Sequence, residues 1–503
     1  MEPLEFRKHF FEDIVIRELG YNPRIEIKPA HLANGFFRAI CGGYVNNEAQ
    51  HMALYPKSYP FLALASLADP RLKAKIQTFS SSQQEALRFL DGKENERAML
   101  NRLFGGDKTL YRLVNTSSYS LSHASHITND NHDRDTGLWL STILRRGDNH
   151  LALDLLTELL LQDSATRNDE LSLITLPLDD TKTKPFQRTT SYQEPEGIQI
   201  NPDGKFKDPI IQIIRSSFDQ LGLNDINNAR KNGKLDTLRH FVTFGCFAVY
   251  FHLANAGRGN SRMPMIFCFN RGLTTLSKAS ILSYHQMMNS INEFMYQKIY
   301  IAVTNLAEGG SYGSWDDDHA IKEHIQSTID WYRMTSEGSR EKEKNLVSKW
   351  QIECQNLYDI YRHGTSSISP RDAIAHALTD MLSVVLSSTP QDVARGLGNR
   401  IGLLGGRQRK IYDPHPDFLE VLVRCSIPLN ETMTLSELAH YWADSFGIFC
   451  GGLGNENDRL SSLGITVDQS EWLENTNALA ELLELSGYAR RYADGVVLVS
   501  VEQ

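Results

Sequence analysis

The chain has few cysteines and no long apolar run, and each absence argues against a class of protein. Its 503 residues include six cysteines, and no two of them have C-x-x-C spacing. A disulfide framework or a thiolate zinc site is therefore not expected. The longest apolar stretch, Phe241 to Ala254, is shorter than the roughly 20 residues that cross a bilayer, and it contains His252. It predicts a buried helix and no membrane partner.

Several nucleotide-binding and catalytic motifs are also missing. The sequence contains no Walker A motif, no G-x-S-x-G elbow and no dinucleotide fingerprint, so we expect neither ATP hydrolysis nor a cofactor. The residues MEPLEFRKHFFED are charged and aromatic where a signal peptide would be apolar, which predicts a cytoplasmic protein. The formal net charge of −9 limits any nucleic-acid surface to a local basic patch.

The composition that remains is globular, and the apolar spacing is helical over most of the chain. Hydrophobic residues make up 41% and charged residues 22%, and the length predicts about three domains. The expected fold class is therefore mainly α and multi-domain, with one small strand insert at Met263 to Asn270. The predicted segments are a helical N-terminal domain (1–163), a linker or extended clamp loop (164–209), a helical central domain (210–394), a basic glycine-rich linker (395–412) and a winged-helix-like domain (413–503).

The last segment has the clearest element order. An apolar helix, DFLEVLVRC, precedes a helix that Thr434 caps with Glu437 three residues on, as in a capping box. A third helix ends at Gly487, and two short strands then meet at the Asp494-Gly495 turn. From Glu431 to the last residue the segment has twelve acidic and three basic residues, a net charge of −9. Because this charge repels phosphate, we expect the segment to bind protein rather than DNA.

One polar run could hold a divalent metal and activate water. The run SHASHITNDNHDRD offers imidazole and carboxylate ligands, of which the candidates are His123, His126, Asp130 and His132. Loops between helices are also rich in Asn, Asp and His, and the spacing matches no zinc signature. We therefore favour a solvated loop with helix caps over a metal site. A second acidic run, SWDDDHAIKEH, predicts a helix start.

The segment SPRDAIAHAL places Arg371, Asp372 and His376 near an expected helix start at Pro370. It resembles the R-polar-x-x-x-H motif of HEPN ribonucleases. In that family the His acts as acid or base toward the RNA 2′-hydroxyl and the Arg stabilises phosphate charge, without metal. The alternative, which we favour, is that Arg371 solvates the helix end while His376 packs against a neighbour.

The best local basic patch lies in the glycine-rich stretch before the C-terminal segment. Its members are Arg395, Arg400, Arg407, Arg409 and Lys410. Glycines there would let the backbone approach a phosphate, which predicts contact with DNA or RNA. A solvated interdomain linker explains the same composition equally well.

Three segments carry a wider resemblance: LANGFFRAICGGYV, PMIFCFNRGLTTLSKASILSYHQ and HPDFLEVLVRCSIPLNETMTLSELAHYWADSFGI. Together they resemble accessory proteins of prokaryotic antiphage defence clusters, which accompany DNA-modification-linked restriction and large ATPases. The resemblance implies a subunit that works with other proteins. We therefore expect a non-catalytic adaptor or scaffold, with a nucleic-acid-cleaving effector as the alternative.

Overall fold

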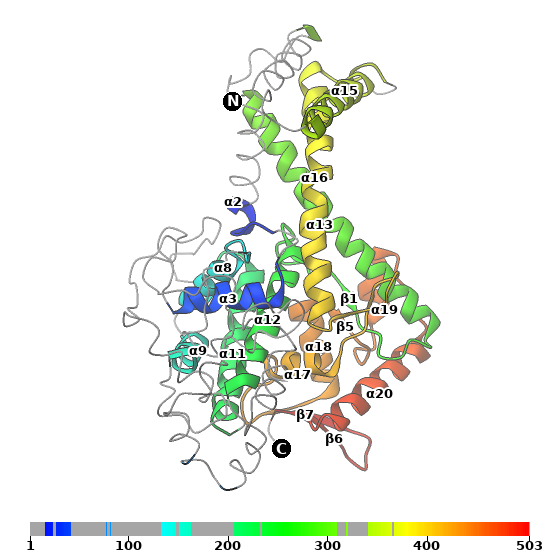
Figure 1. The fold of residues 1–503 in the computed structure, drawn as a ribbon. Helices are drawn as coiled ribbons and strands as arrows, with labels where there is room; N and C mark the ends of the chain where they lie inside the picture. The colour runs from blue at the N-terminus through cyan, green and yellow to red at the C-terminus, as the bar shows by residue number, and fades with distance from the viewer. Residues whose placement is uncertain are drawn as a thin grey trace, which may run out of the picture. The chain divides into compact units, whose positions relative to one another are not determined.

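A computed structural model describes residues 16–23, 27–41, 77, 81, 132–146, 150–161, 206–231, 234–308, 318–319, 341–364 and 367–501. This described part is mainly helical, which confirms the expected fold class (Figure 1). None of its helices combines the length and the apolar character needed to cross a membrane.

The helices include short and long examples. Their bounds are α2 (Ile16–Leu19), α3 (Pro29–Ile40), α8 (Thr136–Arg145), α9 (Leu151–Leu161), α11 (Pro209–Lys231), α12 (Lys234–Asn255), α13 (Thr274–Glu308), α15 (Glu341–His363), α16 (Pro370–Arg400), α17 (Pro416–Arg424), α18 (Leu435–Phe446), α19 (Glu456–Leu460) and α20 (Gln469–Leu485). The strands are β1 (Met265–Ile266), β2 (Leu404–Gly405), β3 (Ile411–Tyr412), β4 (Thr432–Thr434), β5 (Ile448–Phe449), β6 (Ala489–Arg491) and β7 (Val497–Ser500).

The chain divides into two compact units. Unit 1 comprises residues 1–22 and 288–392, and unit 2 comprises residues 23–287 and 393–503. Helices α13 and α16 each contribute residues to both units. Much of the predicted clamp loop at 164–209 lies outside the described residues, as does most of 42–131.

The core of unit 2 is built on α12, the helix that the longest apolar stretch predicts. A helix that is apolar on all sides must be surrounded by protein, and Phe241 to Ala254 is buried except at Thr243. Helices α3 and α11 pack against it. Helix α8 packs on α3 with the two backbones in direct contact at Gly137. A Cβ added to Gly137 would lie 2.2 Å from the backbone nitrogen of Phe36.

The strand insert is confirmed, although only two of its residues form a strand. Strand β1 pairs in parallel with β5, which follows α18 far along the chain. Serine side chains of α13 bond to the neighbouring strands. The Ser280 hydroxyl accepts from the backbone N–H of Tyr412 in β3 at 3.0 Å, and the Ser283 hydroxyl accepts from that of Ile266 in β1 at 3.4 Å.

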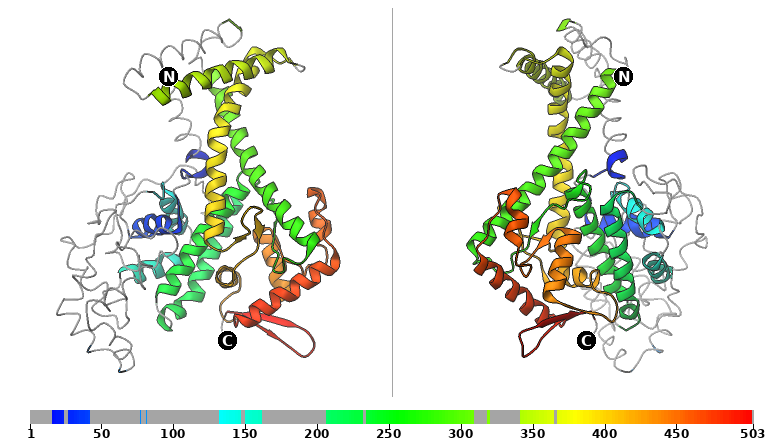
Figure 2. Two further views of the ribbon diagram at one scale, coloured as in Figure 1. Left: turned by 45° about the vertical axis from the view of Figure 1, so that its right-hand side comes forward. Right: turned by 180° about the vertical axis from the view of Figure 1, so that it is seen from behind.

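The C-terminal part of unit 2 has the predicted helices and hairpin. Thr434 and Glu437 form the expected capping box at the start of α18. Gly495, with φ of 86°, closes the β6–β7 hairpin, which projects beyond the end of α20 (Figure 2). Strand β4, which the sequence does not predict, joins the hairpin in an antiparallel sheet of order β4-β7-β6.

This C-terminal part shares its apolar core with the helical part of unit 2. The Phe247 ring of α12 lies 5.3 Å from that of Phe418 on α17 and 5.7 Å from that of Phe446 on α18, between centroids. Edge-to-face pairs of this kind add to the free energy gained by burial. Helix α17 is therefore fixed to α12 by packing as well as by the polar contacts described below.

Unit 1 contains α2, α15 and the adjoining parts of α13 and α16. Helix α16 begins at Pro370, the predicted first helical residue, and the Ser369 hydroxyl accepts from the Asp372 backbone N–H at 3.1 Å. Along α13, Lys298 forms an ion pair with Glu18 of α2. Gln391 of α16 donates to the Met288 carbonyl of α13 at 2.7 Å.

Candidate functional site

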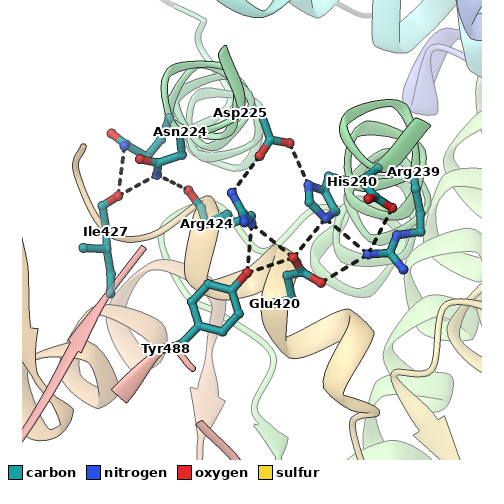
Figure 3. Close-up of polar contacts among 10 residues, drawn as sticks. Asn224, Asp225, Arg239, His240, Glu420, Arg424, Ile427 and Tyr488 are labelled. Carbon is teal, nitrogen blue, oxygen red and sulfur yellow. Dashed lines mark hydrogen bonds and ion pairs between the residues drawn. The ribbon is translucent and has the colours of Figure 1, made fainter. Parts of the chain in front are cut away.

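A cluster of charged and polar side chains joins α11, α12, α17 and Tyr488, the residue directly before β6 (Figure 3). The buried Asp225 carboxylate bonds to His240 Nδ1 at 2.7 Å and accepts from Arg424 Nη1 at 2.9 Å. Glu420 and Tyr488 complete the cluster, which we call the buried ionic network. It lies wholly within unit 2 and ties helices that are about 200 residues apart in sequence.

His240 is the centre of the network and is held between two carboxylates. Its Nδ1 faces Asp225, and its Nε2 lies 3.2 Å from the Glu420 carboxylate. Burial by itself lowers the pKa of His240, but the two carboxylates outweigh it and raise that pKa above its ordinary value. In its protonated form the ring can donate from both nitrogens to these carboxylates, and it then has no free lone pair for general-base chemistry. The geometry stabilises a fixed imidazolium.

Glu420 receives hydrogen bonds from several donors around it. Its Oε1 accepts from the Tyr488 hydroxyl at 2.8 Å and from Arg424 Nε at 3.3 Å, while Oε2 accepts from Arg239 at 3.2 Å. Burial raises the pKa of this carboxyl, but the bond from His240 and the other donors lower it to about 2. Glu420 is therefore an anion at any physiological pH, which matches its role as a partner for cations.

Amide side chains of α11 bind the C-terminal end of α17. Asn224 donates to the carbonyls of Arg424 and Ile427 at 2.6 and 2.8 Å, and Gln220 donates to Ile427 at 3.0 Å. Helix C-termini leave carbonyls without intrahelical partners, so these amides act as a cap supplied by another helix. The C-terminal end of α17 is thus held by α11.

A second contact of this kind joins α20 to α13. Glu471 accepts from the backbone N–H groups of Thr274, Thr275 and Leu276 at 3.1, 3.2 and 2.8 Å. Burial raises its pKa, but these donors outweigh it and lower the pKa below its ordinary value. The Glu471 carboxylate therefore caps the first turn of α13, where the helix dipole favours negative charge.

The buried Asn475 side chain fastens the same helix to the two-stranded sheet. Its amide donates to the carbonyls of Phe267 and Cys450, both at 2.9 Å, and its oxygen accepts from the Phe269 N–H at 2.9 Å. These bonds supply partners to backbone groups at the end of β1 and β5. One face of α20 is therefore committed to contacts inside the chain.

The HEPN-like segment lies in unit 1, where His376 sits among tyrosines. Its ring centroid is 4.7 Å from that of Tyr300 and 5.1 Å from that of Tyr361, and its Nδ1 is 3.2 Å from the Tyr296 hydroxyl. Tyr361 donates to Asp380 at 2.5 Å, and burial followed by this bond raises the pKa of Tyr361 to about 12. A half-buried ring with tyrosine on two sides has the surroundings of a packing residue.

The basic patch consists of the end of α16 and a hairpin. Arg395 and Arg400 are exposed on α16, and Arg407 and Arg409 are exposed in the loop between β2 and β3. Lys410 donates to the Gly406 carbonyl at 2.6 Å; burial and the nearby Arg395 lower its pKa. A bound anion would relieve the repulsion between these cations.

The metal candidate is only partly visible. His123, His126 and Asp130 lie outside the described residues, and the His132 ring stacks on that of His31 at 5.1 Å. Asp133, in the same run, pairs with Arg38 at 3.5 Å and accepts from the Gly137 N–H at 3.1 Å, as a helix cap does. In the second acidic run, Asp318 binds Arg362. Within the described ranges, no cluster of three ligating side chains has metal-site geometry.

The six cysteines are all buried. Burial raises the pKa of Cys354, Cys425 and Cys450 to about 12, so these thiols are protonated and inert at neutral pH.

The buried ionic network is not evident from the sequence. One signal was available, since Glu420 and Arg424 lie four residues apart on an otherwise apolar helix. Their partners Asp225 and His240 come from two other helices, and no local pattern connects them. Comparison with protein-family models and with curated proteins finds no match for the chain.

Proposed function

We propose that this chain is a non-catalytic adaptor that presents an acidic winged-helix module, residues 413–503, to other protein subunits. The observation that carries the proposal is the buried ionic network together with its adjoining caps. The network fixes α17 rigidly on α11 and α12, and its charged groups are paired inside the chain. A rigid base of this kind holds an interaction surface in one orientation, which lowers the entropy cost of binding.

The element order supports a winged helix for this module. Helix α17, strand β4, helices α18 and α20 and the β6–β7 hairpin follow one another, and β7 lies between β4 and β6. The acidic charge favours a protein partner over DNA. The setting implied by the sequence resemblance, an antiphage defence complex with a large ATPase in the cytoplasm, belongs to the proposal. So does phosphate contact through the basic patch, which adds a nucleic-acid partner for the assembly.

The experiment compares assembly with catalysis. We expect the chain, purified under native conditions from its source, to form complexes heavier than its 56.9 kDa in mass photometry. Wild type and His376→Ala are then compared on labelled RNA in EDTA, with melting curves of both. If His376 packs, the variant loses stability and any cleavage in the preparation persists.

An effector would behave differently. Removing a proton-transfer group costs on the order of 100-fold or more in rate. EDTA-resistant cleavage that disappears in an equally stable His376→Ala variant would refute the adaptor and establish the HEPN-like alternative. A chain that stays monomeric in the native preparation would also refute the adaptor.

A further inference from the structure

Helix α20 has a second face that makes none of the contacts described above. Leu473 and Leu485 are 65% and 85% exposed, and Glu474, Asn477 and Glu481 are exposed between them. At 100° per residue these five positions fall within an arc of about 120°, and at 1.5 Å per residue the two leucines are about 18 Å apart along the axis. We call this surface the α20 face.

The composition of the α20 face is unusual for a solvated helix surface. An exposed leucine by itself is common, but here two largely exposed leucines bracket a row of carboxylates on one stripe. Arg491 of the adjacent strand β6 pairs with Glu484, so basic charge beside the stripe is already bound within the chain. Glu474 and Glu481 leave the stripe with negative charge.

We propose that the α20 face binds a basic amphipathic helix of a partner protein. The apolar side of such a helix would cover Leu473 and Leu485, and its Lys or Arg residues would meet Glu474 and Glu481. A helix of about twelve residues matches the distance between the leucines. This inference rests on the proposed adaptor function and names the surface and the partner chemistry through which it acts.

The negative charge of the α20 face favours a basic helix over nucleic acid and over a second copy of this chain. Nucleic acid is repelled by the carboxylates. A second copy of the same face would set glutamates against glutamates, which is unfavourable in an isologous contact. A basic helix satisfies both the leucines and the glutamates.

The probe is a designed 14-residue peptide with leucines at helical spacing and lysines flanking them, and its control is a scrambled peptide of the same composition. Binding to the full chain is measured by fluorescence anisotropy at physiological salt. We expect the patterned peptide to bind at least about 10-fold more tightly than the scrambled one. Leu473→Ser with Leu485→Ser, and separately Glu474→Gln with Glu481→Gln, should each weaken it by about 10-fold or more.

The matched control is Leu282→Ser, because Leu282 is an exposed leucine on another helix of the same unit. It should leave binding within about 2-fold, since it lies outside the α20 face. Circular dichroism melting of each variant shows that the fold persists. Equal binding of both peptides, or unchanged binding by the two double variants, would overturn the proposal. So would duplex DNA or self-association that depends on the same residues.

The same double variants separate this inference from the adaptor function. The adaptor function stands, and the proposal for the α20 face is wrong, if two results occur together. The native complex forms with the wild type and also with the Leu473→Ser, Leu485→Ser variant, and neither peptide binds the wild type. If the wild type forms no complex, the adaptor itself fails, whatever the peptide does.

Discussion

The buried ionic network and the α20 face use the same kinds of side chain for opposite purposes. In the network, the carboxylates of Asp225 and Glu420 are matched by His240 and Arg424 within hydrogen-bonding distance. On the α20 face, Glu474 and Glu481 are exposed. Charges without water need partners inside the protein, whereas exposed charges are free to select partners outside it. The difference separates residues that hold the fold from residues available for binding.

The distribution of net charge makes the same distinction on a larger scale. Residues 431–503 contain three of the 52 basic and twelve of the 61 acidic residues, which leaves 49 of each sign in the rest of the chain. The whole net charge of −9 is therefore located in this segment. Some of its carboxylates are engaged internally, as Glu471 shows, so the charge available to a partner is smaller than the sequence count.

The largest expected effect comes from breaking the network. Asp225→Ala leaves an imidazolium and a guanidinium buried without their shared carboxylate, and we expect a loss of about 3–5 kcal/mol in the free energy of unfolding. Chemical denaturation of the full chain measures it. The control is Asp444→Ala, which removes an exposed ion pair with Arg459 and should cost less than about 1 kcal/mol. Equal losses would show that burial does not determine how much these ion pairs contribute to the free energy of unfolding.

A smaller effect is expected from the cap that α20 supplies to α13. Glu471→Ala removes the acceptor for three backbone N–H groups, and we expect a loss of about 1–2 kcal/mol, as for other helix caps. The comparison is Glu474→Ala on the same helix, an exposed substitution that should change stability by about 0.5 kcal/mol or less. If the two variants unfold alike, Glu471 is only another surface carboxylate.

The pH dependence of stability sharpens the comparison further. His240 has a raised pKa when folded, so its contribution is complete below its unfolded value of about 6.5 and is lost as pH rises through the folded value. Glu420 has a lowered pKa, so its contribution is complete above its unfolded value of about 4.5 and is lost as pH falls toward about 2. Together they stabilise the chain most between about pH 4.5 and 6.5.

Denaturation at a series of pH values, with His240→Gln as reference, measures this contribution. We expect the wild type to lose stability above about pH 6.5 more steeply than the variant, because glutamine does not titrate. Parallel profiles for the two proteins would mean that His240 is neutral in the native state. The test compares only how steeply the free energy of unfolding changes with pH in the two proteins. A lower overall stability of the variant therefore does not affect the result.

Local patterns in the sequence were enough for much of the fold. The apolar run of α12, the capping box at Thr434 and the turn at Gly495 each depend on residues a few positions apart, and all three are confirmed. The β1 insert is confirmed as well. Strand β4 was missed because a three-residue edge strand beside a helix cap has little pattern of its own.

What the sequence by itself determined is therefore the helices, the hairpin and the acidic character of the last segment, because periodicity, caps, turns and charge counts are local quantities. Only the tertiary structure decided which polar side chains became partners. Asp225 meets Arg424 across 199 positions, and Glu471 meets the start of α13 across 195 or more. Such pairs form because the packing of helices brings residues far apart in sequence side by side and removes water from around them, and no rule of local spacing contains that information.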